Sequence, residues 1–196
     1  MSPRSAMIAA MTIPNLLTLL RIALIPVFIL SFYLATGWQH LLTAGIFVLA
    51  AITDWLDGYL ARKWQQTSAF GAFLDPVADK LIVVIALVLI VSEHGGPLMT
   101  IPVAIIIGRE IAVSALREWM AEHGMREHVA VSWVGKVKTA FQMAAIFLLL
   151  LEHSIMGMPV FDIGMLLLYL ATLMTLWSMM AYLKAAWPIL WQKSTA

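Results

Sequence analysis

The chain has 196 residues, of which 62% are hydrophobic and 12% are charged, and its mean hydropathy is +0.92. Soluble domains are about 45–50% apolar and about a quarter charged, so this composition indicates a membrane protein. The formal net charge of +1 argues against a broad nucleic-acid-binding face, and the absence of cysteine excludes a disulfide framework, a zinc finger and thiol catalysis.

Long apolar runs follow one another along the chain, each bounded by Gly, Pro or polar residues. A spanning helix needs about 20 residues to cross roughly 30 Å of hydrocarbon, whereas the strands of a membrane barrel would alternate over about ten residues. We therefore predict a single all-α membrane domain over residues 1–196, in which a short N-terminal juxtamembrane helix precedes a bundle of six transmembrane helices. The predicted spans are Leu16–Ala35, Leu41–Ala61, Ala72–Ser92, Leu98–Met120, Trp133–Leu151 and Val160–Leu183.

Lys and Arg are distributed unevenly over the predicted loops. The loops 37–40, 93–97 and 152–159 hold none of the twelve Lys and Arg residues, whereas the termini and the other loops carry several. Because positively charged loops stay in the cytoplasm, we expect both termini on the cytoplasmic side of the plasma (inner) membrane. The first residues lack the apolar core of a cleaved signal peptide, so the first span is expected to be uncleaved.

Four aspartates interrupt the second and third predicted spans. Asp54 and Asp57 are three residues apart, and Asp75 and Asp79 are four apart, so each pair shares one face of a helix. An Asp at the centre of a spanning helix costs about 2.5–3.5 kcal/mol on insertion scales, so these side chains need a compensating interaction. Because the second span runs toward the cytoplasm and the third runs back, both pairs are expected to meet at the cytoplasmic end.

Carboxylates without His or Cys nearby form an all-oxygen ligand set, which suits Mg²⁺ or Mn²⁺ better than zinc or copper. Two such ions would balance four negative charges. An alternative interpretation pairs Asp79 with Lys80 or Arg62 and lets Asp75 merely begin a helix ahead of Pro76.

Small residues accompany the acids. Gly58 and Ala61 lie on or beside the acidic face and Gly71 lies one turn before Asp75, so a bulky ligand can approach closely. Together these positions form the pattern Asp54-x2-Asp57-Gly58-x2-Ala61-Arg62-x8-Gly71-x3-Asp75-x3-Asp79. This pattern resembles the signature of the CDP-alcohol phosphatidyltransferase family at every fixed position.

The resemblance implies a six-helix membrane enzyme, usually a homodimer, in which an alcohol hydroxyl attacks a CDP-linked lipid such as CDP-diacylglycerol and CMP leaves. It also implies that the four aspartates hold two metal ions, with Asp79 acting in addition as general base. By the same resemblance Gly58, Ala61, Arg62 and Gly71 lie along the CDP-lipid. Because the predicted spans contain no His or Cys, we predict a direct displacement without a covalent enzyme intermediate.

Basic residues in the fourth and fifth predicted spans form a second group. Arg109 is expected at about mid-depth in the fourth span and Arg117 two turns nearer the cytoplasm, while Lys136 and Lys138 begin the fifth span on the same side. Four cations so placed need an anionic partner, which a phosphate-bearing acceptor would supply. In the alternative interpretation Arg109 pairs with neighbouring acids, and the lysines are ordinary cytoplasmic loop charge.

Three further motifs resemble one branch of the family, whose acceptor is sn-glycerol 3-phosphate and whose product is phosphatidylglycerophosphate. They are Pro14-Asn15-Leu16-Leu17-Thr18 with Arg21, Gly108-Arg109-Glu110-Ile111 through Arg117, and Gly135-Lys136-x-Lys138-Thr139-x2-Gln142. The resemblance implies that Arg109, Arg117, Lys136 and Lys138 bind the acceptor phosphate, with Thr139 and Gln142 as weaker candidates. Glu110 is expected to orient an arginine.

Two other functions remain open at this point. A sibling transferase would use inositol phosphate, serine or phosphatidylglycerol as its acceptor. A divalent-cation transporter could also carry acids inside its spans, although here the acids cluster at one end and leave no continuous polar path.

Overall fold

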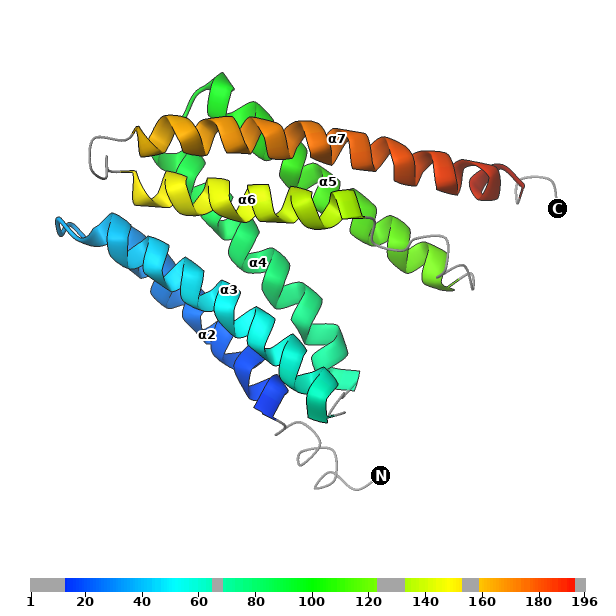
Figure 1. Cartoon of the computed structure of the whole chain (residues 1–196), viewed down its shortest axis with the longest axis horizontal. Coiled ribbons are helices and arrows are strands. Elements are labelled where there is room, and N and C mark those ends of the chain that lie inside the picture. Colours follow the sequence, from blue (N-terminus) through cyan, green and yellow to red (C-terminus); the bar gives the residue numbers. More distant parts are fainter. Residues whose placement is uncertain (1–12, 65–68, 123–132, 153–158, 193–196) are drawn as a thin grey trace. The chain divides into compact units, whose positions relative to one another are not determined.

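The computed structural model describes residues 13–64, 69–122, 133–152 and 159–192, and every regular element within these ranges is a helix (Figure 1). The N-terminal juxtamembrane helix that the sequence predicts lies outside the described residues. The helices are α2 (Ile13–Phe32), α3 (Gln39–Trp64), α4 (Ala69–Glu93), α5 (Pro97–Glu122), α6 (Trp133–Leu151) and α7 (Val160–Gln192).

Within the described ranges, four helices are long and apolar enough to cross a membrane. Their apolar segments are Asn15–Phe32, Gln39–Trp64, Pro97–Met120 and Val160–Lys184, and α6 contributes a shorter apolar stretch, Val137–Leu151. Charged residues, among them Asp75, Asp79 and Lys80, interrupt the apolar sequence of α4. The all-helical class and the presence of several membrane-length helices are therefore confirmed, while the count of six spans stays a prediction.

The chain divides into two compact units. The first unit holds residues up to Ile90 together with the end of α6 from Leu150. In it α2 packs along α3 (Figure 1), with the rings of Phe28 and Phe47 6.4 Å apart. The hydroxyls of Ser31 and Thr43 lie 3.0 Å apart beside these rings, so the contact between the two helices combines apolar packing with a buried hydrogen bond.

The second unit holds residues 91–149 and the chain from Pro159 onward. Here α5 packs against α7, and the Tyr169 hydroxyl of α7 donates a hydrogen bond of 2.7 Å to the Leu98 carbonyl at the start of α5. Gly164 of α7 is buried against α6, where a Cβ atom would lie 3.0 Å from Cγ of Leu149. Glycine at this position permits the close approach of α6 and α7.

Candidate functional site

The acidic residues of the predicted signature lie on α3 and α4 of the first unit. Asp54 and Asp57 are in the last three turns of α3, and Asp75 and Asp79 are in the first half of α4. Because α4 begins at Ala69, Asp75 lies inside the helix, and the interpretation in which Asp75 begins it is wrong.

Arg21 of α2 is the cation around which three of these carboxylates gather. Its guanidinium pairs through Nη2 with Asp57 and through Nη1 with Asp79, and Nη1 also lies 3.0 Å from Asp54 Oδ1. The Arg21 side chain is 1% exposed and that of Asp57 is 5% exposed, so this pair is withdrawn from solvent. Asp79 therefore pairs with a residue of α2, which the sequence analysis did not consider as its partner.

Thr18 joins the fourth carboxylate to the same cluster. Its hydroxyl lies 2.5 Å from Asp75 Oδ1, which accepts the hydrogen bond, and 3.5 Å from Asp57 Oδ2. Asn15, Thr18 and Arg21 recur at three-residue spacing on α2, and all three are buried. Residues at this spacing lie close together on a helix, so α2 presents a polar face to the acids of α3 and α4.

Negative charge is in excess in this cluster. Among the described residues, three of the four carboxylates pair with the Arg21 guanidinium and the fourth accepts a hydrogen bond from Thr18. The carboxylates of Asp54 and Asp79 are 45% and 42% exposed. Oxygen ligands that remain partly accessible and carry excess negative charge fit a hard divalent cation such as Mg²⁺ or Mn²⁺. The donor set present in the first unit therefore suits the metal that the sequence predicts.

The remaining signature residues lie near the acids in the sequence, in the same two helices. Gly58 lies one turn before Arg62 on α3, and a Cβ atom at Gly58 would be 3.6 Å from Nη1 of Arg62, so the arginine side chain lies back along the helix over the glycine. Arg62 is exposed, Ala61 is half-buried and Gly71 is buried in the first turn of α4.

A second polar cluster lies in the second unit. Arg109 and Lys138 are buried, and both reach one oxygen of Glu110: Oε1 lies 3.2 Å from Arg109 Nη1 and 2.6 Å from Lys138 Nζ. Arg109 thus pairs with its neighbouring acid, as the alternative interpretation predicts, and Glu110 contacts an arginine, as expected. Glu110 also joins α5 to α6. Arg117 and Lys136 belong to α5 and α6, and their side chains lie outside the described part of the structure.

The two weaker candidates on α6 differ in their surroundings. The Thr139 hydroxyl is exposed and donates to the Gly135 carbonyl of its own helix at 2.9 Å. Gln142 is 4% exposed and lies one turn from Lys138 on the same face. Of the two, Gln142 is the buried one, on the helix face that carries Lys138.

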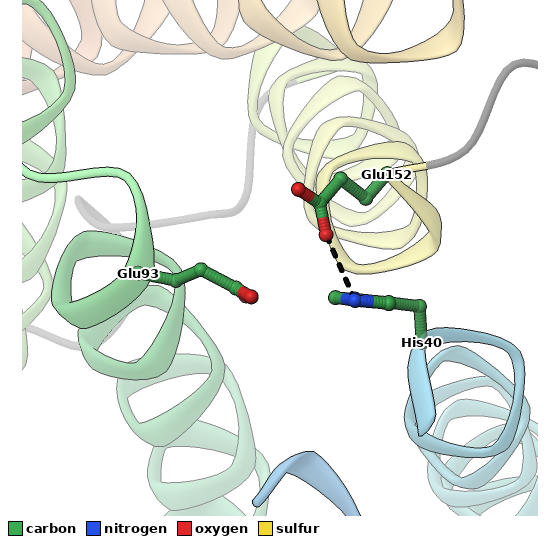
Figure 2. A group of neighbouring side chains, drawn as sticks. All are labelled: His40, Glu93 and Glu152. Carbon is green, nitrogen blue, oxygen red and sulfur yellow. Dashed lines mark ion pairs between the residues drawn. The ribbon is translucent and has the colours of Figure 1, made fainter. Parts of the chain in front are cut away.

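Two groups of contacts were missed in the sequence analysis. Ser178 and Tyr182 of α7 both contact Arg109; serine and tyrosine at i and i+4 inside an apolar run were the signal that could have revealed them. In the first unit, His40 Nε2 at the start of α3 lies 2.9 Å from Glu152 Oε2 beyond the end of α6 (Figure 2). The His40–Glu152 pair ties the first turn of α3 to the end of α6.

The sequence is similar to known proteins over most of its length. Residues 11–177 match the CDP-alcohol phosphatidyltransferase family. A CDP-diacylglycerol–glycerol-3-phosphate 3-phosphatidyltransferase of Pectobacterium atrosepticum is 58% identical over 176 residues, which are 89% of this chain and 94% of that protein. Proteins of the same name from Shigella flexneri and Salmonella typhimurium are each 54% identical over 174 residues, with the same coverage.

Proposed function

This chain belongs to the CDP-alcohol phosphatidyltransferase family, and we propose that it transfers the phosphatidyl group of CDP-diacylglycerol to sn-glycerol 3-phosphate. The products are phosphatidylglycerophosphate and CMP. The observation that carries this proposal is the identity of 54–58% over about nine-tenths of the chain with enzymes named for this reaction.

The acidic cluster of the first unit is the proposed donor site. Asp54, Asp57, Asp75 and Asp79 would hold two Mg²⁺ or Mn²⁺ ions, which supply positive charge to the diphosphate of the donor and to the departing phosphate. Support comes from the three carboxylates that pair with the one guanidinium of Arg21 in the described part of the first unit. The signature residues Gly58, Ala61, Arg62 and Gly71 are the proposed contacts of the CDP-lipid.

Asp79 is the proposed general base. Its carboxylate is 42% exposed, so the hydroxyl of a water-soluble acceptor can reach it, whereas Asp57 is buried. The proton of that hydroxyl passes to a carboxylate oxygen while the hydroxyl oxygen bonds to the phosphorus of the phosphatidyl group and the bond from this phosphorus to CMP breaks. This single displacement needs no covalent enzyme intermediate, and isolation of a phosphatidyl-enzyme would contradict it.

The basic cluster of the second unit is the proposed site for the acceptor phosphate. Arg109 and Lys138 are buried cations that share one carboxylate oxygen, so a phosphate brought to them would meet two charged donors. Arg117 and Lys136 complete this proposed set on the basis of the family resemblance.

The remaining expectations describe how the enzyme sits in the cell. We propose one domain of six spans in the bacterial inner membrane, with both termini and the reacting groups on the cytoplasmic side, assembled as a homodimer among membrane lipids. The apolar helices and the absence of Lys and Arg from the loops 37–40, 93–97 and 152–159 support this arrangement.

Acceptor identity can be tested with the purified full-length protein. Reactions would contain CDP-diacylglycerol, Mg²⁺ and, in separate tubes, radiolabelled sn-glycerol 3-phosphate, inositol phosphate, serine or phosphatidylglycerol. We expect label in the lipid fraction and equimolar CMP only with sn-glycerol 3-phosphate. Transfer to another acceptor would make the protein a sibling transferase, and metal flux into proteoliposomes without CMP release would make it a cation transporter.

A further inference from the structure

Helix α7 carries a polar face that the predicted chemistry does not use. Thr175, Ser178 and Tyr182 are spaced i, i+3 and i+7 in a largely apolar helix, so they lie on one side of it. Thr175 is 0% exposed and Ser178 is 6% exposed. Buried polar side chains in a helix of membrane-spanning character are costly unless they have a partner, and they commonly mark a functional contact.

Ser178 has such a partner in Arg109 of α5. Nη2 of Arg109 donates a hydrogen bond of 2.9 Å to Ser178 Oγ. The Ser178 hydroxyl in turn donates to the Thr175 carbonyl at 2.9 Å, so its proton is directed to the backbone and its lone pairs are left for the guanidinium. A guanidinium can only donate, so Ser178 accepts this hydrogen bond while its own proton is held by α7.

Two further contacts fix the orientation of the guanidinium. Nη1 of Arg109 lies 3.2 Å from Glu110 Oε1, and Cζ lies 5.8 Å from the centre of the Tyr182 ring. Arg109 is thus held by a hydroxyl, a carboxylate and an aromatic face before any ligand binds. Such restraint lowers the side-chain entropy that an arginine loses when it binds a phosphate.

The same cluster retains unused hydrogen-bonding capacity. Among the described residues, Nε of Arg109, Oε1 of Gln142 and Oγ1 of Thr175 are buried without a hydrogen-bond partner. A buried polar atom without a partner is destabilising. Two of these three atoms belong to Arg109 and Thr175, which both contact Ser178. We take the three atoms to indicate that a polar ligand completes the cluster.

We propose that Ser178 is a positioning residue that orients the Arg109 guanidinium toward the phosphate of the acceptor. This inference rests on the proposed function, since it takes the acceptor to carry a phosphate. The serine acts only through Arg109 and touches neither the donor nor the reacting atoms, so its loss weakens acceptor binding and leaves the handling of CDP-diacylglycerol unchanged.

The test compares two variants of the full-length enzyme that differ only in the hydroxyl. Ser178→Thr keeps the hydrogen-bond acceptor, and Ser178→Val replaces it with a methyl group of the same shape. We expect Ser178→Val to raise KM for sn-glycerol 3-phosphate about tenfold, with kcat and KM for CDP-diacylglycerol within about twofold of the wild type. Ser178→Thr should restore most of the acceptor KM.

Thr172→Val is the matched control on the same helix. Thr172 is 5% exposed, and its hydroxyl donates to the Leu168 carbonyl of α7, so this change removes a buried hydroxyl that does not touch Arg109. We expect its acceptor KM to equal that of the wild type. Equal acceptor KM values for Ser178→Val and Ser178→Thr, or parallel changes in both substrate KM values, would overturn the inference.

The activity of the wild-type protein distinguishes a wrong positioning role for Ser178 from a wrong proposed function. A wild-type protein that transfers nothing to sn-glycerol 3-phosphate refutes the proposed function itself. An active wild type whose acceptor KM is insensitive to Ser178→Val refutes only the positioning role. Thermal unfolding of each variant in detergent reports loss of folding, and the comparison of Thr with Val remains informative when both lose stability to the same extent.

Discussion

At the scale of single residues, the decisive feature is how buried charge is compensated. The aspartates could be predicted as a cluster because each one interrupts an apolar run at a position where an unpaired charge is expensive. The cation that pairs with these aspartates could not be predicted. Arg21 lies more than thirty residues before Asp54 and near the start of its own apolar run, where an arginine is commonly interfacial. Only the packing of α2 against α3 brings the guanidinium to the acids.

Asp57→Asn tests the proposed metal ligands. The substitution keeps the shape of the side chain and removes a charged oxygen, so we expect CMP release to fall at least about 100-fold and Mn²⁺ affinity to fall with it. Asp162→Asn, at an exposed position in the first turn of α7, is the control and should have wild-type turnover. Normal activity of Asp57→Asn would exclude Asp57 as a metal ligand.

Arg21→Met tests the role of the guanidinium in protein without metal. Removing the cation leaves the buried Asp57 carboxylate without its partner, so we expect the variant in EDTA to unfold at a lower temperature than the wild type. Mg²⁺ should then raise Tm more in the variant than in the wild type, because metal binding has more uncompensated charge to neutralise. Equal Mg²⁺-induced shifts in Tm would contradict this account.

At the scale of helices, five of the six predicted apolar segments lie within helices, and the first, Leu16–Ala35, runs three residues past the end of α2 at Phe32. The second predicted span, Leu41–Ala61, lies inside α3, which extends to Gln39 and Trp64. The last one ends at Leu183, whereas α7 continues to Gln192 and includes Pro188. Hydrophobic runs indicate where lipid-facing sequence ends, but backbone hydrogen bonding carries a helix past that point into polar sequence.

Side-chain contacts between helices were much harder to predict. Arg109 and Glu110 are sequence neighbours, whose side chains ordinarily diverge, yet Arg109 contacts Glu110 Oε1, and Lys138 reaches the same oxygen from α6. Ser178 resembles a packing residue in an apolar run until α5 is placed beside it. Such pairs depend on which helix faces meet, and periodicity alone does not determine that.

Gly164→Ala tests the close approach of α6 and α7. The added methyl group would lie 3.0 Å from Cγ of Leu149 and 3.2 Å from Cβ of Leu148, so we expect overpacking to lower stability by roughly 1–3 kcal/mol. Gly45→Ala in α3 is the control, because its methyl group meets open space and alanine favours the helix. Thermal unfolding in detergent measures both, and equal Tm values would show that α7 can shift away from α6.

At the scale of the whole molecule, the distribution of charge predicts which side of the membrane each loop occupies. The absence of cysteine makes this testable, since any introduced thiol is the sole target of a thiol reagent. In intact cells we expect a membrane-impermeant maleimide to label Gly37→Cys, in the loop before α3, and to label Lys63→Cys at the end of α3 only after permeabilisation. The opposite pattern would place the termini and the acidic cluster outside the cytoplasm.

Arg21 also bears on how the protein is made. A nascent chain enters the bilayer before it binds any metal ion. At that stage its acidic side chains would be exposed to hydrocarbon without a compensating positive charge. Because the guanidinium precedes the acids in the chain, the first helical hairpin already brings a counter-charge to Asp57. We therefore expect membrane insertion and early folding to proceed at cellular magnesium levels too low to sustain turnover.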